Sequence, residues 1–129
     1  MNAKTKTVLI VDDDSIFREL LFCALAGTFS VITAEDGEMG VKIARAMLPD
    51  LIILDIMMPK MSGLEALKEL LQEEGTARIP VLICTGSNFD PEMRNVFRIE
   101  RNCAGFFSKT APLDFITGTV ERTLGMTGG

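Results

Sequence analysis

The chain has 129 residues, the length of one ordinary domain, and 47% of them are hydrophobic, which is enough for one globular core. Its formal net charge of −5 argues against nucleic-acid binding, which favours a basic surface. The absence of histidine excludes histidine-based general acid–base catalysis, Ser-His-Asp triads and histidine metal ligands. Any chemistry must therefore use carboxylate, hydroxyl, amine and backbone groups.

Neither secretion nor membrane insertion is indicated. The apolar run VLIV after MNAKTKT is too short for the core of a signal peptide, and no run approaches the ~18 apolar residues of a membrane span. We therefore expect a cytoplasmic protein. The widely spaced cysteines form no C-x-x-C motif and predict neither zinc nor a disulfide framework. Cys23 and Cys84 lie in apolar runs and are expected to be reduced core thiols.

Five short apolar runs predict β-strands, in chain order at residues 8–11, 31–33, 51–54, 81–84 and 105–107. The first, third and fourth are continuously apolar, which is typical of a parallel sheet covered on both faces. Apolar residues at helical spacing follow each run, over residues 17–25, 40–47, 64–71, 93–97 and 113–120. This alternation predicts one α/β domain with right-handed crossovers and helices on both faces of the sheet.

Local signals mark several element boundaries. Ser62 and Glu65 match the S-x-x-E capping box just before the third helical segment. Asp90 and Pro91 place a cap residue and a first-turn proline before the fourth. Three glycines are expected at element ends and turns, namely Gly27, Gly75 and Gly86.

Polar residues follow four of the five predicted strands, at the edge where ligands bind in a sheet of this kind. In chain order they are Asp12, Asp13, Asp14, Asp55, Thr85, Gly86, Ser108 and Lys109. If the first and third strands are neighbours, Asp12, Asp13 and Asp55 converge, and their like charges demand a proton or a cation. Oxygen ligands without nitrogen or sulfur suit Mg²⁺. Together with a lysine and a threonine, this set fits phosphoryl transfer, in which an aspartate can be the nucleophile.

The motifs VLIVDDD, LIILDIMMPKMSG, VLICTGS and GFFSK occur in order and in register. With them the chain resembles the receiver domain of bacterial two-component response regulators. The resemblance implies a single receiver domain over residues 1–129, with a core over about 6–124 and a tail or linker stub over 125–129. It implies a flavodoxin-like (βα)5 fold, doubly wound, with a five-stranded parallel sheet. The strand order 2-1-3-4-5 is taken from the family's chemotaxis member rather than derived from this sequence.

The resemblance also implies the roles of the acidic residues. Asp55 would be the phosphoacceptor and would receive a phosphoryl group from a phosphohistidine. The donor partner would be a sensor histidine kinase or a histidine phosphotransfer protein. Asp12, Asp13, Asp55 and the backbone carbonyl of Met57 would bind Mg²⁺.

Three further roles follow from the resemblance. Lys109 would pair with the phosphoryl group, Thr85 would hydrogen-bond to it as a switch, and Phe106 would be the switch aromatic. Two positions depart from the family pattern. Thr110 replaces the usual proline, so a trans bond and a reshaped loop are expected. Phe106 replaces the common tyrosine, and without a hydroxyl its inward rotamer cannot be fixed by a hydrogen bond.

The implied function is a signalling switch, whose only chemistry is its own phosphorylation and slow dephosphorylation, rather than an enzyme. Its output would use the fourth helix, fifth strand and fifth helix, through a shift in a two-state equilibrium. A downstream target or effector domain would bind there, and a homodimer through this face is a further expectation. Met57 and Ser87 would flank the path of the hydrolytic water, and the bulk of Met57 is expected to slow dephosphorylation.

Other interpretations remain open. Asp12-x-Asp14 after a strand superficially resembles the motif of haloacid-dehalogenase-type aspartyl phosphatases, but this leaves LDIMMPKMSG unexplained. A phosphorylation-independent interaction domain of the same fold is the third function considered. Asp14 alone reads as a residue at a helix N-terminus. Several side chains are expected only to pack, namely Met57, Met58, Met61, Phe97 and Phe107.

Overall fold

The computed structural model describes residues 5–58, 60–86 and 91–126. Five parallel strands form one sheet in the order β2-β1-β3-β4-β5, which confirms the expected fold class. The strands are β1 (Thr7–Val11), β2 (Ser30–Ala34), β3 (Leu51–Asp55), β4 (Val81–Thr85) and β5 (Cys103–Ser108). All residues of β3 and β4 are buried, which explains why their sequences are continuously apolar.

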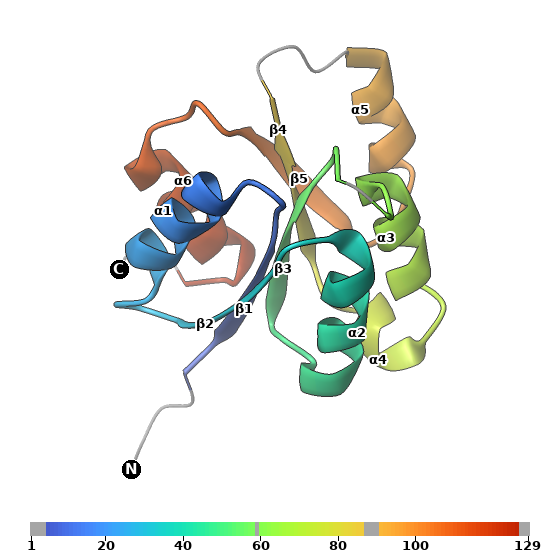
Figure 1. Cartoon of the computed structure of the whole chain (residues 1–129), viewed down its shortest axis with the longest axis horizontal. Helices are drawn as coiled ribbons and strands as arrows, with labels where there is room; N and C mark the ends of the chain where they lie inside the picture. The colour runs from blue at the N-terminus through green and yellow to red at the C-terminus, as the bar shows by residue number, and fades with distance from the viewer. Residues whose placement is uncertain (1–4, 59, 87–90, 127–129) are drawn as a thin grey trace.

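Helices cover both faces of the sheet. They are α1 (Ser15–Leu25), α2 (Gly37–Met47), α3 (Gly63–Leu70), α4 (Glu74–Ala77), α5 (Pro91–Arg98) and α6 (Leu113–Thr123). Figure 1 shows α1 and α6 on one face, and α2, α3, α4 and α5 on the other. No helix in the described part of the chain combines the length and the apolar character that a membrane crossing requires.

The short helix α4 was not predicted. Its four residues are too few to show an apolar repeat, and Gly75 lies inside it rather than at an element end. The buried hydroxyl of Thr76 donates to the Leu70 carbonyl at 2.6 Å, so this turn is attached to the end of α3. The α5 cap predicted at Asp90 lies outside the described residues, although α5 does begin at Pro91.

The core consists of one apolar cluster on each side of the sheet. Along β3, Ile52 and Leu54 belong to the cluster beneath α2 and α3, while Leu51 and Ile53 belong to the cluster beneath α1 and α6. This alternation follows from the two-residue period of a strand. The central strands are therefore packed on both faces, and their carboxyl ends lie together at one edge of the sheet.

One expectation about the cysteines was wrong. Cys84 is fully buried in β4, as predicted, but Cys23 is exposed on α1. The neighbouring Leu20 and Phe22 are also exposed, by 46% and 41%. The apolar run that suggested burial therefore extends beyond the buried stripe of α1, which consists of Phe17, Leu21 and Leu25.

The start of α3 fixes the loop after β3. Ser62 and Glu65 form the predicted capping box, with the Ser62 hydroxyl accepting from Glu65 N at 3.2 Å and Glu65 Oε1 accepting from Ser62 N at 3.1 Å. A Cβ on Gly63 would lie 2.7 Å from the Asp55 carbonyl oxygen and 2.8 Å from Ile56 Cα. Glycine is therefore required where α3 begins against the end of β3.

Candidate functional site

Three carboxylates meet at the carboxyl edge of the sheet. Asp12 directly follows β1, Asp55 ends β3, and these two strands are paired with Val11 opposite Leu54. Oxygen atoms of Asp12, Asp13 and Asp55 all lie within 4.8 Å of one another. Asp12 and Asp55 are buried, whereas Asp13 is exposed. The predicted convergence is present, and this donor set suits a hard divalent cation such as Mg²⁺.

Burial disfavours the ionised forms of the two buried carboxylates, Asp12 and Asp55. Removal from water raises the pKa of Asp55 to about 6, and the charge of Asp12 adds to this effect while Lys109 opposes it. Burial also raises the pKa of Asp12, although the Asp14 backbone N–H and Lys109 both favour its ionised form. The cluster therefore favours a proton or an additional cation beyond Lys109.

Lys109 reaches the cluster from the end of β5. Its Nζ lies 3.0 Å and 3.1 Å from the two carboxylate oxygens of Asp12, and 3.6 Å from Asp55 Oδ2. Burial lowers the pKa of Lys109, but the hydrogen bond and the charge of Asp12, with the charge of Asp55, outweigh it and raise the pKa overall. The Lys109 backbone N–H donates to the Thr85 carbonyl at 2.8 Å. The lysine is thus anchored to β4 and remains cationic between two carboxylates.

Thr85 ends β4, the strand beside β3. Its side chain is buried, and its hydroxyl donates to the Phe107 carbonyl at 3.3 Å. The structure thus brings Thr85 to the same edge as Asp55, with its hydroxyl bonded to β5.

Comparison with known proteins agrees with this geometry. The family model described as "Response regulator receiver domain" matches residues 8–121. This chain belongs to the response regulator receiver domain family. The receiver domain therefore accounts for most of the chain.

Individual relatives differ in how much of their length the receiver domain spans. The alkaline phosphatase synthesis transcriptional regulatory protein PhoP of Bacillus subtilis is 37% identical over 105 residues, which cover 81% of this chain and 42% of PhoP. The polar-differentiation response regulator DivK of Brucella ovis is 30% identical over 125 residues, covering 94% of this chain and 98% of DivK. The crystal structure of the chemotaxis response regulator CheY4 of Vibrio cholerae superposes with a TM-score of 0.85 at 26% identity, covering 93% of this chain and 99% of CheY4.

Phe106 of β5 is half-buried and packs against the core cluster beneath α2 and α3. Its ring meets Phe97 of α5 edge to face, with centroids 6.4 Å apart and an interplanar angle of 87°. The guanidinium groups of Arg94 and Arg98 lie 5.0 Å and 5.7 Å from the Phe106 centroid. The ring therefore contacts one aromatic residue and two cations, all of them on α5.

The turn after Lys109 is closed by hydroxyl groups. Thr110 N donates to Ser108 Oγ at 3.1 Å, and the two hydroxyl oxygens lie 2.8 Å apart. No cis peptide bond occurs among the described residues, so the Lys109–Thr110 bond is trans as expected. A proline at position 110 could not make this backbone donation.

The methionines after Asp55 divide into two groups. Met58 and Met61 pack against the core as expected, but the side chain of Met57 is 80% exposed. The expectation that Met57 packs was therefore wrong, because its position on the loop beyond the strand end directs it to solvent. Pro59 and Ser87 lie outside the described residues.

Residues after the end of β2 support the loop that follows β3, which was not predicted from the sequence. Asp36 is 8% exposed and caps α2 by accepting from Met39 N at 2.8 Å. Its other oxygen lies 3.7 Å from Nζ of Lys60, which has a left-handed φ of 71° in the loop after β3. A Cβ on Gly37 would lie 2.7 Å from the Met61 carbonyl oxygen. The start of α2 thus supports the loop that carries Met57, and the Asp-Gly pair before a helix was the available signal.

The first turn of α1 also positions the acidic residues. This role of the helix was not predicted from the sequence. Asp14 is the N-cap of α1, as its plainer interpretation predicted, and its N–H donates to Asp12 Oδ1 at 2.9 Å. Arg18 donates to the Asp12 carbonyl at 2.6 Å. The Lys109 ammonium lies 5.0 Å from the centroid of Phe17. The only sequence signal was the helical spacing that places Phe17 and Arg18 one turn beyond Asp14.

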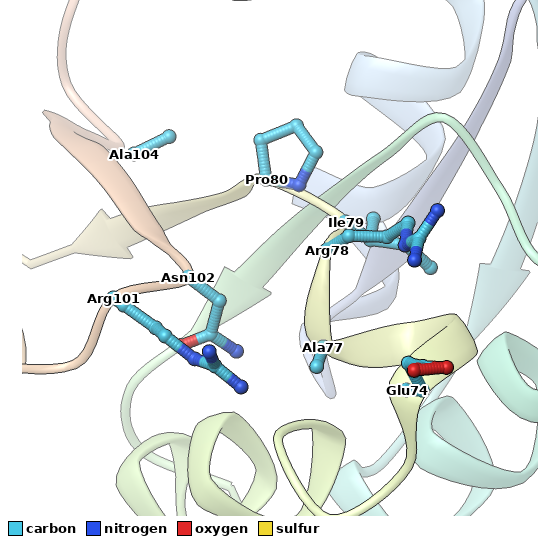
Figure 2. A pocket seen from close by; sticks show the side chains of 8 residues that line it. All are labelled: Glu74, Ala77, Arg78, Ile79, Pro80, Arg101, Asn102 and Ala104. Atoms are coloured by element: carbon cyan, nitrogen blue, oxygen red, sulfur yellow. The ribbon is translucent and has the colours of Figure 1, made fainter.

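A pocket of about 390 Å³ lies at the opposite edge of the sheet, near the amino ends of β4 and β5. It is lined by Glu74, Ala77, Arg78, Ile79, Pro80, Arg101, Asn102 and Ala104 (Figure 2). None of the acidic cluster contributes to this pocket. The candidate site is thus defined by converging charged groups at the carboxyl edge and is separate from this pocket.

Proposed function

We propose that this receiver domain is a phosphoacceptor switch in which Asp55 receives a phosphoryl group from a phosphohistidine of a partner protein. The observation that carries the proposal is the position of Asp55. Its carboxylate ends a buried central strand, beside the carboxylates of Asp12 and Asp13 and 3.6 Å from the Lys109 ammonium. This arrangement combines a nucleophile, a place for a metal ion and a fixed cation, which are the groups that phosphoryl transfer needs.

Each functional group of the chain would have a separate role in the reaction. A carboxylate oxygen of Asp55 attacks phosphorus, the bond between phosphorus and the imidazole nitrogen breaks, and its electron pair stays on the imidazole. Asp12, Asp13, Asp55 and the carbonyl oxygen of Met57 would hold Mg²⁺, which supplies positive charge to phosphoryl oxygens when bound. Lys109 would neutralise a further phosphoryl oxygen, since its ammonium lies 3.6 Å from Asp55. Positive charge at the cluster also lowers the pKa of Asp55, so that its nucleophilic form is present at neutral pH.

Phosphorylation would change the hydrogen bond of Thr85. Its hydroxyl donates to Phe107, and an acyl phosphate on Asp55 offers a more highly charged acceptor at the same edge. A change of partner at Thr85 would release the Phe107 carbonyl and alter the packing of Phe106 beside it. The face formed by α5, β5 and α6 would carry this change to a downstream target, an effector domain or a second copy of the chain.

The phosphoryl donor would be a sensor histidine kinase or a histidine phosphotransfer protein in the cytoplasm. The proposal includes no other substrate: the chain catalyses its own phosphorylation and a slow hydrolysis of the product. A catalytic aspartyl phosphatase would instead use Asp12 as the nucleophile.

Phosphoryl incorporation tests the proposal. The protein is incubated with acetyl phosphate and Mg²⁺, and its intact mass is measured. Wild type is expected to gain one phosphoryl group, EDTA to prevent the gain, and Asp55→Asn to abolish it. Asp114→Asn, in the exposed first turn of α6, is the matched control and should be labelled like wild type. An Asp55→Asn variant labelled to the same extent as wild type would rule out Asp55 as the acceptor.

A further inference from the structure

The ring of Phe17 lies beneath the ammonium group of Lys109. Nζ is 5.0 Å from the ring centroid, within the range at which an aromatic face attracts a cation. Phe17 is 7% exposed and belongs to the core cluster beneath α1 and α6. The Lys109 side chain is 22% exposed, and partial removal from water strengthens such an attraction. Lys109 therefore contacts two carboxylates and one neutral ring.

These contacts respond differently to a divalent cation. Both oxygens of Asp12 lie within 3.1 Å of Lys109 Nζ, and the same carboxylate belongs to the cluster that would hold Mg²⁺. A divalent cation on Asp12 thus competes with Lys109 for the same oxygens and repels its charge. The face of Phe17 carries no formal charge and is not a ligand for a hard cation. Its attraction for Lys109 therefore persists when Asp12 is occupied.

The ring is also fixed relative to the acidic cluster. Phe17 N donates to the N-cap carboxylate of Asp14 at 3.3 Å, and the Asp14 N–H donates to Asp12 Oδ1. Arg18 donates to the Asp12 carbonyl from the following helical position. The turn that presents Asp12 therefore also sets the position of the ring.

We propose that Phe17 is a positioning residue for phosphoryl transfer: its ring face holds the Lys109 ammonium beside Asp55 while a divalent cation occupies Asp12. The inference rests on the proposed function, because Lys109 acts on the phosphoryl group only if Asp55 is the acceptor. Phe17 touches Lys109 and acts through it, without contact with the phosphoryl group.

The test compares wild type with Phe17→Leu and Phe29→Leu. Phe29 is 4% exposed and belongs to the same core cluster, but it precedes β2 at the opposite edge of the sheet. Both variants lose a buried ring, so a general loss of packing affects both. Only Phe17→Leu removes the ring beneath Lys109.

Two measurements follow. NMR records the Cε protons of Lys109 with and without Mg²⁺, assigned with Lys109→Arg. In wild type and Phe29→Leu these protons should be shifted upfield by the ring in both conditions, and Phe17→Leu should lose the shift. With saturating Mg²⁺, the rate of phosphoryl incorporation from acetyl phosphate should fall about fivefold to tenfold in Phe17→Leu. In Phe29→Leu it should stay within about twofold of wild type, since its ring has no contact with the reacting groups.

Three results would overturn the inference. These are an upfield shift that disappears in wild type when Mg²⁺ is added, a wild-type rate in Phe17→Leu, and an equal loss of rate in both leucine variants. If wild type takes up no phosphoryl group at all, the proposed function fails. The NMR shift then still decides whether Phe17 holds Lys109 in the presence of Mg²⁺.

Discussion

At the residue scale, the site is dominated by the conflict between burial and charge at Asp55. Its pKa is raised from 3.8 to about 6, so ionisation of this carboxyl is less favourable in the folded chain than in the unfolded chain. The penalty is absent below the unfolded pKa of 3.8, grows as the pH rises toward 6, and is complete above 6. Ionised Asp55 therefore destabilises the metal-free protein at neutral pH.

Removal of this charge should stabilise the metal-free protein. In EDTA at pH 7.5, Asp55→Asn is expected to raise the free energy of unfolding by about 1–3 kcal/mol, and the gain should vanish near pH 4. Urea unfolding at a series of pH values measures this. Glu19→Gln, an exposed change on α1, is the control and should alter stability by less than about 0.5 kcal/mol. A gain for Asp55→Asn that is equal at both pH values would contradict the assigned cause.

The side chain of Met57 is expected to lengthen the lifetime of the phosphorylated state. Its apolar side chain is 80% exposed on the loop two residues beyond Asp55, where it would hinder water approaching an acyl phosphate. Met57→Asn keeps the backbone carbonyl and replaces the apolar group with a polar one, so the phosphoryl lifetime should shorten severalfold. Met47→Asn changes a 60% exposed methionine at the end of α2 and should leave the lifetime unchanged. Equal lifetimes for wild type and Met57→Asn would refute this role.

At the scale of elements, the strands and the capping box at the start of α3 were predictable, but the contacts between the loops that support the site were not. The runs at 51–54 and 81–84 predicted β3 and β4 because strands buried on both faces must be apolar throughout. Helix α4 was not predicted because its four residues are too few to show the periodic spacing of apolar residues in a helix. The contact of Gly37 with Met61, and the left-handed Lys60, depend on how α2 meets the loop after β3. Such contacts between distant segments leave no local pattern in the sequence.

The join between β3 and α3 gives a test at this scale. A Cβ at Gly63 would lie within 3 Å of backbone atoms of Asp55 and Ile56, which cannot move aside as a flexible side chain could. Gly63→Ala is expected to destabilise the protein by about 2 kcal/mol or more and to slow phosphoryl incorporation, because the strand end carrying Asp55 must shift. Thermal unfolding and the acetyl phosphate assay measure the two effects.

Gly27 provides the control for this substitution, because no atom lies within 4 Å of a Cβ added there. Gly27→Ala should leave both stability and phosphorylation close to wild type. If Gly63→Ala behaves like Gly27→Ala, the close approach of α3 to the end of β3 is not important for the site.

At the scale of the whole molecule, the sheet order is what assembles the site. Asp12 and Asp55 are distant in sequence but meet because β1 and β3 are paired, and Lys109 reaches them from β5. The convergence of these residues was predictable from their places after apolar runs, with the strand order taken from the family resemblance. Phe17, Arg18 and Asp36 were missed because their roles arise from three-dimensional contacts with that cluster.

Divalent cations should stabilise the whole fold by linkage. An ion that binds the cluster only in the folded chain raises the free energy of unfolding. The increase is about 2.7 kcal/mol when the ion concentration is 100 times the dissociation constant. Mg²⁺ should therefore raise the midpoint of thermal unfolding of wild type in a concentration-dependent way. Asp13→Asn should lose most of this increase, and Asp114→Asn should keep it. A midpoint for wild type that does not depend on Mg²⁺ would contradict the metal assignment.

The most direct test of the central claim is the position of the phosphoryl group after reaction with acetyl phosphate and Mg²⁺. Proteolysis followed by tandem mass spectrometry separates the peptide that contains Asp55 from the one that contains Asp12. The account predicts one phosphoryl group on Asp55. A phosphoryl group on Asp12 would contradict it and favour an aspartyl phosphatase, and a protein that takes up neither phosphoryl group nor Mg²⁺ would be a phosphorylation-independent interaction domain.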